Sequence, residues 1–274
     1  MSTPLYGGQH VDPAYQLRYS WCGWLARSYA RSAGWDVVLA RTARTWETDG
    51  LRLLEATSDN DSIQLLFSAL PYVSPVTIAV RAKGRLQHTA KQLGQACNFS
   101  RKLSVRSIGD NTTSQVERYI RAQVAKEDFV DPRLVDTLDQ FTVIDNTVDL
   151  SKPTASRSGR YWYNLHIVLV MRQRGNVVDE YCLRNIRDTS LAVANKKEYR
   201  IAALSLMPDH LHMALRGHIQ HSPQEIVLAF QNSTAWRLGA KAIWQDSYYV
   251  GTFSEYDMNA IRRRVLARQT NSSR

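Results

Sequence analysis

The sequence predicts an α+β fold made of two similar units in tandem. Two observations carry this prediction: the order of periodic segments in the second half of the chain, and the recurrence of that order in the first half. The size of the chain agrees, because 274 residues with 44% hydrophobic content are enough for two domains of about 100–150 residues, each with its own core.

The second half alternates strand-like and helix-like segments. Pro208 and Asp209 alone separate two of the strand-like runs, which predicts a hairpin. Ser222 and Pro223 have the composition of a helix start. The resulting order is β-α-β-β-α-β-α, a ferredoxin-like (βαββαβ) plan with an added C-terminal helix. The segments are residues 161–171, 176–197, 199–207, 210–217, a helix from 222, 247–253 and 258–269.

The first half repeats this order, which predicts an internal duplication. At an offset of 148 the matching residues are Tyr15 and Tyr163, Leu17 and Leu165, Arg52 and Arg200, Asp61 and Asp209, and Ser74-Pro75 and Ser222-Pro223. At an offset of 145 they are Phe99 and Trp244, Val105 and Val250, Val116 and Ile261, Arg118 and Arg263, and Ala122 and Ala267. We therefore predict an N-terminal tail over 1–14, a first domain over 15–129, a connecting segment and linker over 130–160, and a second domain over 161–274.

Charge and composition narrow the class of partner. Thirty-five Lys and Arg against 25 Asp and Glu leave a formal net charge of +10, which favours a polyanionic partner such as nucleic acid. Three unpaired cysteines without C-x-x-C spacing favour a reducing compartment. The sequence has no apolar run of membrane-spanning length and no secretory signal pattern, so we expect no membrane partner and a cytoplasmic location.

The segment MPDHLHMAL sets His210 and His212 one residue apart in an apolar run. Side chains of a strand alternate between its faces, so both imidazoles point to the same side and Leu211 points to the core. Two imidazoles so placed can share one divalent cation. The same spacing also arises by chance on half-exposed strands, and the flanking sequence is what favours a metal site.

MPDHLH after an apolar strand, then a strand, then Ser-Pro opening a helix, then WQDSYYVGTF, resembles the single-tyrosine HUH transposases. The first half is similar to that family through VSPVTIAVRAKGR and FSRKLSVRSIGDNTTSQVERYIRAQ. The resemblance implies a histidine pair that holds Mg²⁺ or Mn²⁺ on the scissile phosphate and a nucleophilic tyrosine on the last helix. It also implies a glutamine ligand four residues after the tyrosine.

The family's residues are divided between the two halves. In the second half the histidine pair is present as His210 and His212, but the tyrosine and glutamine positions fall on Arg264 and Arg268. In the first half the reverse holds: the nucleophile position is Tyr119 and the glutamine position is Gln123, whereas the histidine positions fall on Ser62 and Gln64.

The family resembles homodimers in which the tyrosine helix of one subunit reaches the histidine pair of the other. A fused chain would then be a monomeric pseudo-dimer with one complete site, made of Tyr119 as nucleophile and His210, His212 and Gln123 as metal ligands. The second site would be degenerate. The implied activity is metal-dependent cleavage and transfer of single-stranded DNA through a 5′-phosphotyrosine intermediate, with DNA hairpins as the recognised structure.

Basic residues outside this site are candidate phosphate contacts, although a solvated basic face is an equally good interpretation for about half of them. They are Lys83, Arg85, Arg101, Lys102, Arg106, Arg216, Arg237 and Lys241. Two other functions stay open at this point: an inactive DNA-hairpin-binding protein derived from such a transposase, and an unrelated ferredoxin-like RNA-binding protein in which the histidines are incidental.

Overall fold

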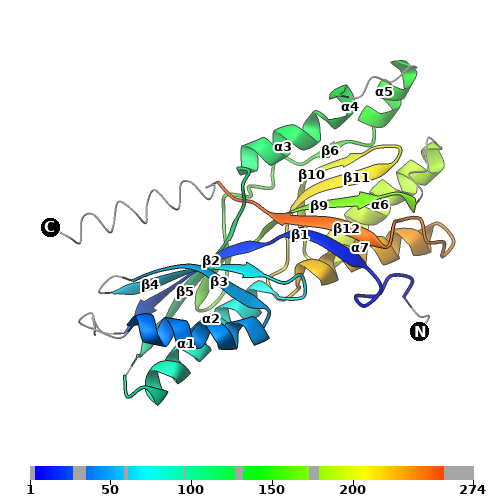
Figure 1. Ribbon diagram of the computed structural model, residues 1–274. Helices are drawn as coiled ribbons and strands as arrows, with labels where there is room; N and C mark the ends of the chain where they lie inside the picture. The colour runs from blue at the N-terminus through cyan, green and yellow to red at the C-terminus, as the bar shows by residue number, and fades with distance from the viewer. Residues whose placement is uncertain are drawn as a thin grey trace.

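The computed structural model describes residues 4–26, 35–58, 61–95, 97–126, 132–172 and 179–255. They form a mixed α+β structure with two six-stranded sheets, called sheet A and sheet B below (Figure 1). The described helices are α1 (Trp35–Thr48), α2 (Pro75–Gln92), α3 (Thr113–Arg121), α4 (Gln123–Lys126), α5 (Pro132–Asp139), α6 (Glu180–Lys196) and α7 (Pro223–Arg237). The predicted terminal helix over 258–269 lies outside the described residues.

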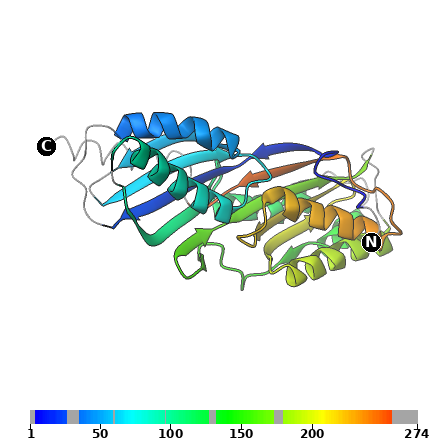
Figure 2. The same ribbon diagram turned by 90° about the horizontal axis from the view of Figure 1, so that it is seen from below.

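Sheet A is built mainly from the second half of the chain. Its strand order is β1-β12-β9-β11-β10-β6. The bounds are β1 (Asp12–Gln16), β12 (Ser247–Thr252), β9 (Asn164–Val170), β11 (His210–Arg216), β10 (Arg200–Leu206) and β6 (Val143–Ile144). From β9 to β12 the chain runs β-α-β-β-α-β, as the sequence pattern predicts, and α6 and α7 cover one face of the sheet (Figure 2).

Sheet B repeats this plan with the first half. Its order is β3-β4-β2-β5-β8-β7. The bounds are β3 (Leu51–Ser58), β4 (Ser62–Ala69), β2 (Arg18–Leu25), β5 (Phe99–Ile108), β8 (Gly159–Trp162) and β7 (Thr154–Ala155). Helices α1 and α2 cover one face (Figure 2). In both sheets the first strand of the β-α-β-β-α-β run lies between the third and the fourth.

Local details recur at matching positions. Ser74 caps α2 and Ser222 caps α7, each followed by a proline that starts the helix without an unsatisfied N–H. The β3/β4 hairpin has a register irregularity between Leu53 and Glu55, and the β10/β11 hairpin has one between Ile201 and Ala203. Both pairs of positions are 148 residues apart, so the predicted offset holds for the hairpin and for the helix that follows it.

The predicted offset is wrong by two residues for the first strand of each unit. Gln64 of β4 lies opposite Cys22 of β2, and His212 of β11 lies opposite Val168 of β9. Since Gln64 and His212 match, Cys22 matches Val168, and Tyr15 therefore matches Tyr161 rather than Tyr163. A slip of two residues keeps every side chain on the same face of a strand, so the pattern of apolar residues cannot reveal it.

The sheets do not follow the predicted domain boundaries. The predicted tail over 1–14 contributes to β1, which pairs in parallel with β12 of the second half. In the same way β8, which precedes β9, pairs in parallel with β5 of the first half. Each unit thus contributes a strand to the other sheet, β1 at the edge of sheet A and β8 between β5 and β7 of sheet B. Residues 130–160, predicted as a connecting segment and linker, contain α5, the short strands β6 and β7, and the start of β8.

The two units share one core. Buried side chains of both sheets belong to one continuous cluster, and the rings of Tyr19 and Tyr163 meet with centroids 6.3 Å apart. Cys22, Cys97 and Cys182 form no disulfide. Within the described part of the chain, no helix has the length and apolar character needed to cross a membrane.

Candidate active site

Helix α3 belongs to the first half of the chain but packs on sheet A. Thr112 caps it through a capping box with Gln115, which fixes where the helix begins. Val116 and Ile120, four residues apart on one face, are buried against Ala203 and Ala214 of β10 and β11. This packing lays the tyrosine helix of one unit across the open face of the other unit's sheet, opposite α6 and α7 (Figure 1).

Three histidines lie on that open face. His210 and His212 occupy alternate positions of β11, as the sequence predicts, and their ring centroids are 4.8 Å apart. His166 of β9 lies on the same face, because it is two residues from Val168, the cross-strand neighbour of His212. His166 Nε2 and His212 Nδ1 are 3.1 Å apart and share a hydrogen bond.

Tyr119 stands against these histidines. Its ring meets the ring of His212 edge-on, with centroids 5.3 Å apart, and the ring of His166 at 6.0 Å. The side chain remains 42% exposed, so the phenol is open to a substrate. Gln123 follows one turn later, is buried, and donates from Nε2 to the Tyr119 carbonyl at 3.1 Å. Its Oε1 is the atom that could ligate a cation.

Burial keeps the imidazoles of His212 and His166 neutral. Burial lowers the pKa of His212 to about 3, and the neighbouring His166, His210 and Lys126 further oppose a positive charge there. Burial alone lowers the pKa of His166 to about 4. At neutral pH the ring nitrogens of both residues therefore keep a lone pair for a hydrogen bond or for a metal.

The donor set fits a divalent cation held by His210 and His212. The Nδ1 atom of His210 is 2.5 Å from Asp209 Oδ1, and the Nδ1 atom of His212 is bonded to His166. In each ring this leaves Nε2 as the atom for a ligand, the usual arrangement in which the second nitrogen of a metal-binding imidazole has a protein partner. Among the described residues no group of three His, Cys, Asp or Glu side chains is placed to hold a metal. Gln123 is the third ligand that the sequence predicts.

Sequence reasoning missed three residues of this site. His166 occupies an alternate position in the apolar run NLHIVLV, a signal of the same kind as the His210–His212 pair. Asp209 was assigned only to the turn. Lys126 has no motif of its own, yet its ammonium lies 4.2 Å from the centroid of the Tyr119 ring, a cation–π contact.

The positions of the predicted degenerate site are separated from Tyr119 by the fold. Ser62 and Gln64 lie on β4 of sheet B, and Gln64 Nε2 donates to Ser20 Oγ at 3.0 Å. The structure thus brings Tyr119 to the histidine pair of the second half and leaves Ser62 and Gln64 on the other sheet. Arg264 and Arg268 lie outside the described residues.

The predicted phosphate contacts fall into two groups. Arg101, Lys102 and Lys241 are exposed. The others already bind protein groups: Arg85 forms a bidentate pair with Asp49, Lys83 binds the Ser100 carbonyl, Arg106 stacks on Trp162, Arg216 binds the Asp149 carbonyl and Arg237 binds Asn185. Those five would have to share or exchange a partner to reach a phosphate.

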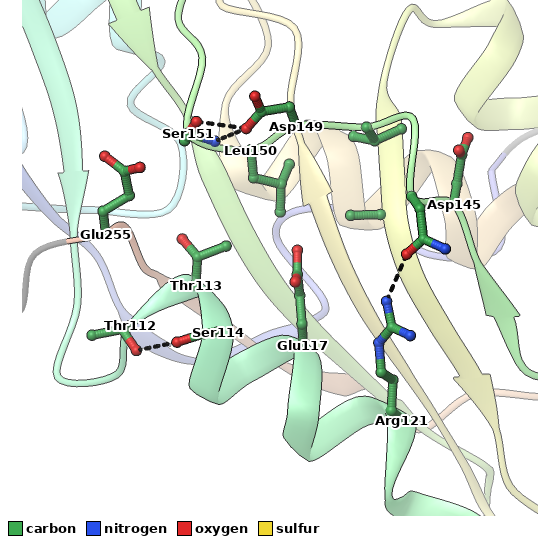
Figure 3. A pocket seen from close by; sticks show the side chains of 13 residues that line it. Thr112, Thr113, Ser114, Glu117, Arg121, Asp145, Asp149, Leu150, Ser151 and Glu255 are labelled. Carbon is green, nitrogen blue, oxygen red and sulfur yellow. Dashed lines mark hydrogen bonds between the residues drawn. The ribbon is translucent and has the colours of Figure 1, made fainter.

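A polar pocket of about 580 Å³ lies on another side of α3 (Figure 3). Glu117 and Arg121 point into it. They are four residues apart and share one face of the helix, so Tyr119, two residues from each, lies on a different face. Asp145, Asp149 and Glu255 also line it, and burial raises the pKa of Glu117. With four carboxylates and one guanidinium, the lining of this pocket disfavours a phosphate.

Comparison with known proteins gives one family and several solved structures. Residues 160–265 match the family model described as "Transposase IS200 like". A candidate transposase from Deinococcus radiodurans R1 is 23% identical, with 38% of this chain and 88% of that chain covered at a TM-score of 0.32. The REP-associated tyrosine transposase bound to a REP hairpin is 16% identical, with 38% of this chain and 62% of that chain covered at a TM-score of 0.31. Comparison with curated proteins gives no match.

Proposed function

We propose that the protein is a metal-dependent endonuclease and strand transferase for single-stranded DNA, because residues 160–265 match the IS200-like transposase family model. The same match supports a transposase-type role in DNA processing. The finer proposal is a single composite site that cuts through a 5′-phosphotyrosine intermediate. One observation carries it: Tyr119 of the first half lies against His212 of the second half, with ring centroids 5.3 Å apart.

The proposed reaction begins with the Tyr119 hydroxyl. Its oxygen attacks the phosphorus of a phosphodiester, a tyrosine O–P bond forms, and the bond from phosphorus to the 3′ oxygen breaks. The phenol proton passes to water and the leaving oxygen takes up a proton, which gives a free 3′-OH. The reverse attack by a 3′-OH on the phosphotyrosine reseals or transfers the strand and restores the phenol.

The surrounding residues would position this reaction. His210 and His212 through Nε2, and Gln123 through Oε1, would hold Mg²⁺ or Mn²⁺, which neutralises the non-bridging phosphate oxygens when bound. The Lys126 ammonium, 4.2 Å from the centroid of the Tyr119 ring, adds positive charge where the phenolate and the phosphate meet.

The chain would act as a monomeric pseudo-dimer derived by duplication of one ferredoxin-like unit with an added helix. The exchanged strands β1 and β8 support this, because each pairs with the last strand of the other unit's β-α-β-β-α-β run, where a strand of a second copy would otherwise pair. Light scattering should give a mass near 31.2 kDa. A mass near twice that value would show that the two units do not satisfy each other's interface. A cytoplasmic location forms part of the same proposal.

A direct experiment is covalent trapping. The protein is incubated with Mn²⁺ or Mg²⁺ and single-stranded oligonucleotides that contain the imperfect palindromes flanking its gene, and the products are resolved under denaturing conditions. We expect a protein–DNA adduct that mass spectrometry maps to Tyr119, and no adduct in excess chelator. An adduct on another residue, or one that forms equally well in chelator, would refute the composite site.

The second candidate is a hairpin-binding protein that no longer cuts. The presence of Ser62 and Gln64 at the positions that correspond to the histidine pair favours it, because a duplicated chain would then have lost one of its two metal sites. In the trapping experiment this function predicts no adduct but tighter binding to hairpins than to random single strands at matched salt. Equal binding to both would instead favour a general nucleic-acid-binding protein.

A further inference from the structure

We propose that His166 is a positioning residue that fixes the tautomer and orientation of His212 for cation binding. The proposal rests on the proposed function, because it requires His210 and His212 to be the metal ligands. His166 is not part of the H-x-H motif and comes from a different strand, β9, so its role is visible only in the folded chain.

The geometry of His166 fits a support rather than a ligand. Its Nε2 lies 3.1 Å from His212 Nδ1, and the two rings are stacked with an interplanar angle of 20° and centroids 5.3 Å apart. The atom that could bind a metal is therefore turned toward the neighbouring imidazole.

The ring of His166 is itself held from two sides. Tyr119 meets it with centroids 6.0 Å apart, and Tyr249 of β12 meets it at 5.8 Å. Gly251, directly opposite His166 on β12, makes this possible, because a Cβ there would lie 2.4 Å from the Tyr249 hydroxyl. A side chain with this support loses little freedom when it holds a hydrogen bond.

The positions of the ring protons decide which histidine donates and which accepts. If His212 binds the cation through Nε2, its proton must be on Nδ1, and that N–H donates to His166 Nε2. His166 then carries its own proton on Nδ1. Without an acceptor at this point, neutral His212 could place its proton on Nε2, where it would block the ligand position.

An independent observation comes from the other sheet. Gln64 lies opposite Cys22, and His212 lies opposite the matching residue Val168. Ser20 and His166 each come two residues before these positions. Gln64 and Ser20 of sheet B therefore correspond to His212 and His166 of sheet A. Gln64 Nε2 donates to Ser20 Oγ at 3.0 Å. Both sheets therefore link the same two strand positions, and in sheet A the link is built from imidazoles.

The test measures Mn²⁺ binding to the full chain without DNA. His166→Leu removes the acceptor and should weaken Mn²⁺ binding about 10–100-fold, the range for loss of a partner to a metal-binding imidazole. His166→Gln retains an acceptor and should stay within about threefold of the unmodified protein, since a comparable hydrogen bond can form. Ser20→Ala, at the corresponding position of sheet B, is the matched control and should not change Mn²⁺ binding.

Nitrogen NMR of the metal-free protein gives a second reading that does not depend on affinity. The His212 ring should be protonated on Nδ1 in the unmodified protein and should become a mixture of tautomers in His166→Leu. This reading also distinguishes a lost hydrogen bond from a damaged fold, because an unfolded variant loses the dispersed spectrum altogether.

The outcomes separate this inference from the proposed function. If the unmodified protein binds no Mn²⁺, or if His210→Ala and His212→Ala bind it undiminished, the metal site of the proposed function is wrong. If those two variants lose Mn²⁺ but His166→Leu retains full affinity and a single His212 tautomer, only the role of His166 is overturned. If His166→Gln is as defective as His166→Leu and three imidazole nitrogens couple to Mn²⁺, His166 is a ligand and not a positioning residue.

Discussion

The open face of sheet A and the corresponding face of sheet B have the same main-chain framework and different chemistry. Both hairpins are irregular at matching positions, and both following helices begin with a capped Ser-Pro. At the linked pair of positions, however, sheet A has His166 and His212 whereas sheet B has Ser20 and Gln64. Backbone hydrogen bonds and apolar packing maintain the framework, and a few side chains on each sheet set the chemistry of its face.

The interface between the units shows the opposite case, in which both halves retain the same interaction. The Arg18 amide donates to Thr252 Oγ1 at 2.9 Å, and the Asn164 amide donates to Ser107 Oγ at 3.1 Å. These two contacts occupy corresponding positions of the two units. Arg18 corresponds to Asn164 at an offset of 146, and Ser107 corresponds to Thr252 at an offset of 145. Both hydroxyl residues are buried, so each hydroxyl accepts from a main-chain N–H in place of water.

The largest expected effect belongs to the nucleophile. Tyr119→Phe should reduce covalent attachment to hairpin DNA by at least about 1,000-fold, because no other group replaces the attacking oxygen. Tyr248→Phe, Tyr249→Phe and Tyr256→Phe should still form the adduct. Denaturing gels and peptide mapping give the measurement, and continued cutting by Tyr119→Phe would exclude a site shared between the two halves.

Next in size is the loss of a histidine ligand. His210→Ala or His212→Ala should lower cleavage at least about 100-fold, since even an indirect partner of a metal ligand is worth 10–100-fold. Hairpin binding should change little, because phosphate contacts elsewhere position the DNA. Ser62→Ala and Gln64→Ala, the matching changes in sheet B, should leave cleavage unchanged, and a comparable loss there would mean that both faces are active.

The interface contacts should show equal roles in the two halves. Thr252→Val and Ser107→Ala each leave a buried amide without an acceptor, so each should lower the free energy of unfolding by about 1–3 kcal/mol. Urea denaturation measures both. A large effect of one change and none of the other would show that the contacts are equivalent in position but not in energy.

The smallest predicted effect is on pH dependence. The pKa values of His212 and His166 in the folded protein are about 3 and about 4, below the ordinary value near 6.5. Between these values and pH 6.5 the unfolded chain binds more protons, so stability is full above about pH 6.5 and falls as the pH drops toward about 4.

Replacing His166 and His212 with the pair found in sheet B provides the control for this effect. The double variant His166→Ser, His212→Gln should lose part of the stability change between about pH 7.5 and about pH 5, measured by urea denaturation. An unaltered pH dependence in the double variant would mean that other groups produce it.

The sequence alone predicted the β-α-β-β-α-β order that both halves have, but not the strands β1, β6, β7 and β8. It also showed a tyrosine–glutamine pair in one half and a histidine pair in the other. These are local properties: periodicity sets the element type, Ser-Pro sets a helix start, and H-x-H sets two imidazoles on one face. The two-residue error in matching Tyr15 to Tyr163 has the same origin, because a shift of two residues leaves the alternation of side chains along a strand unchanged.

Only the tertiary structure decided which residues meet. It placed α3 on sheet A, so that Tyr119 lies beside His212, and it brought His166, Lys126 and Asp209 into the same site. In the folded chain β1 also pairs with β12, in the sheet of the second half. These outcomes depend on which sheet edges and apolar faces remain open after each unit has formed. Pairing between distant segments is set by that global competition, which no window of local sequence contains.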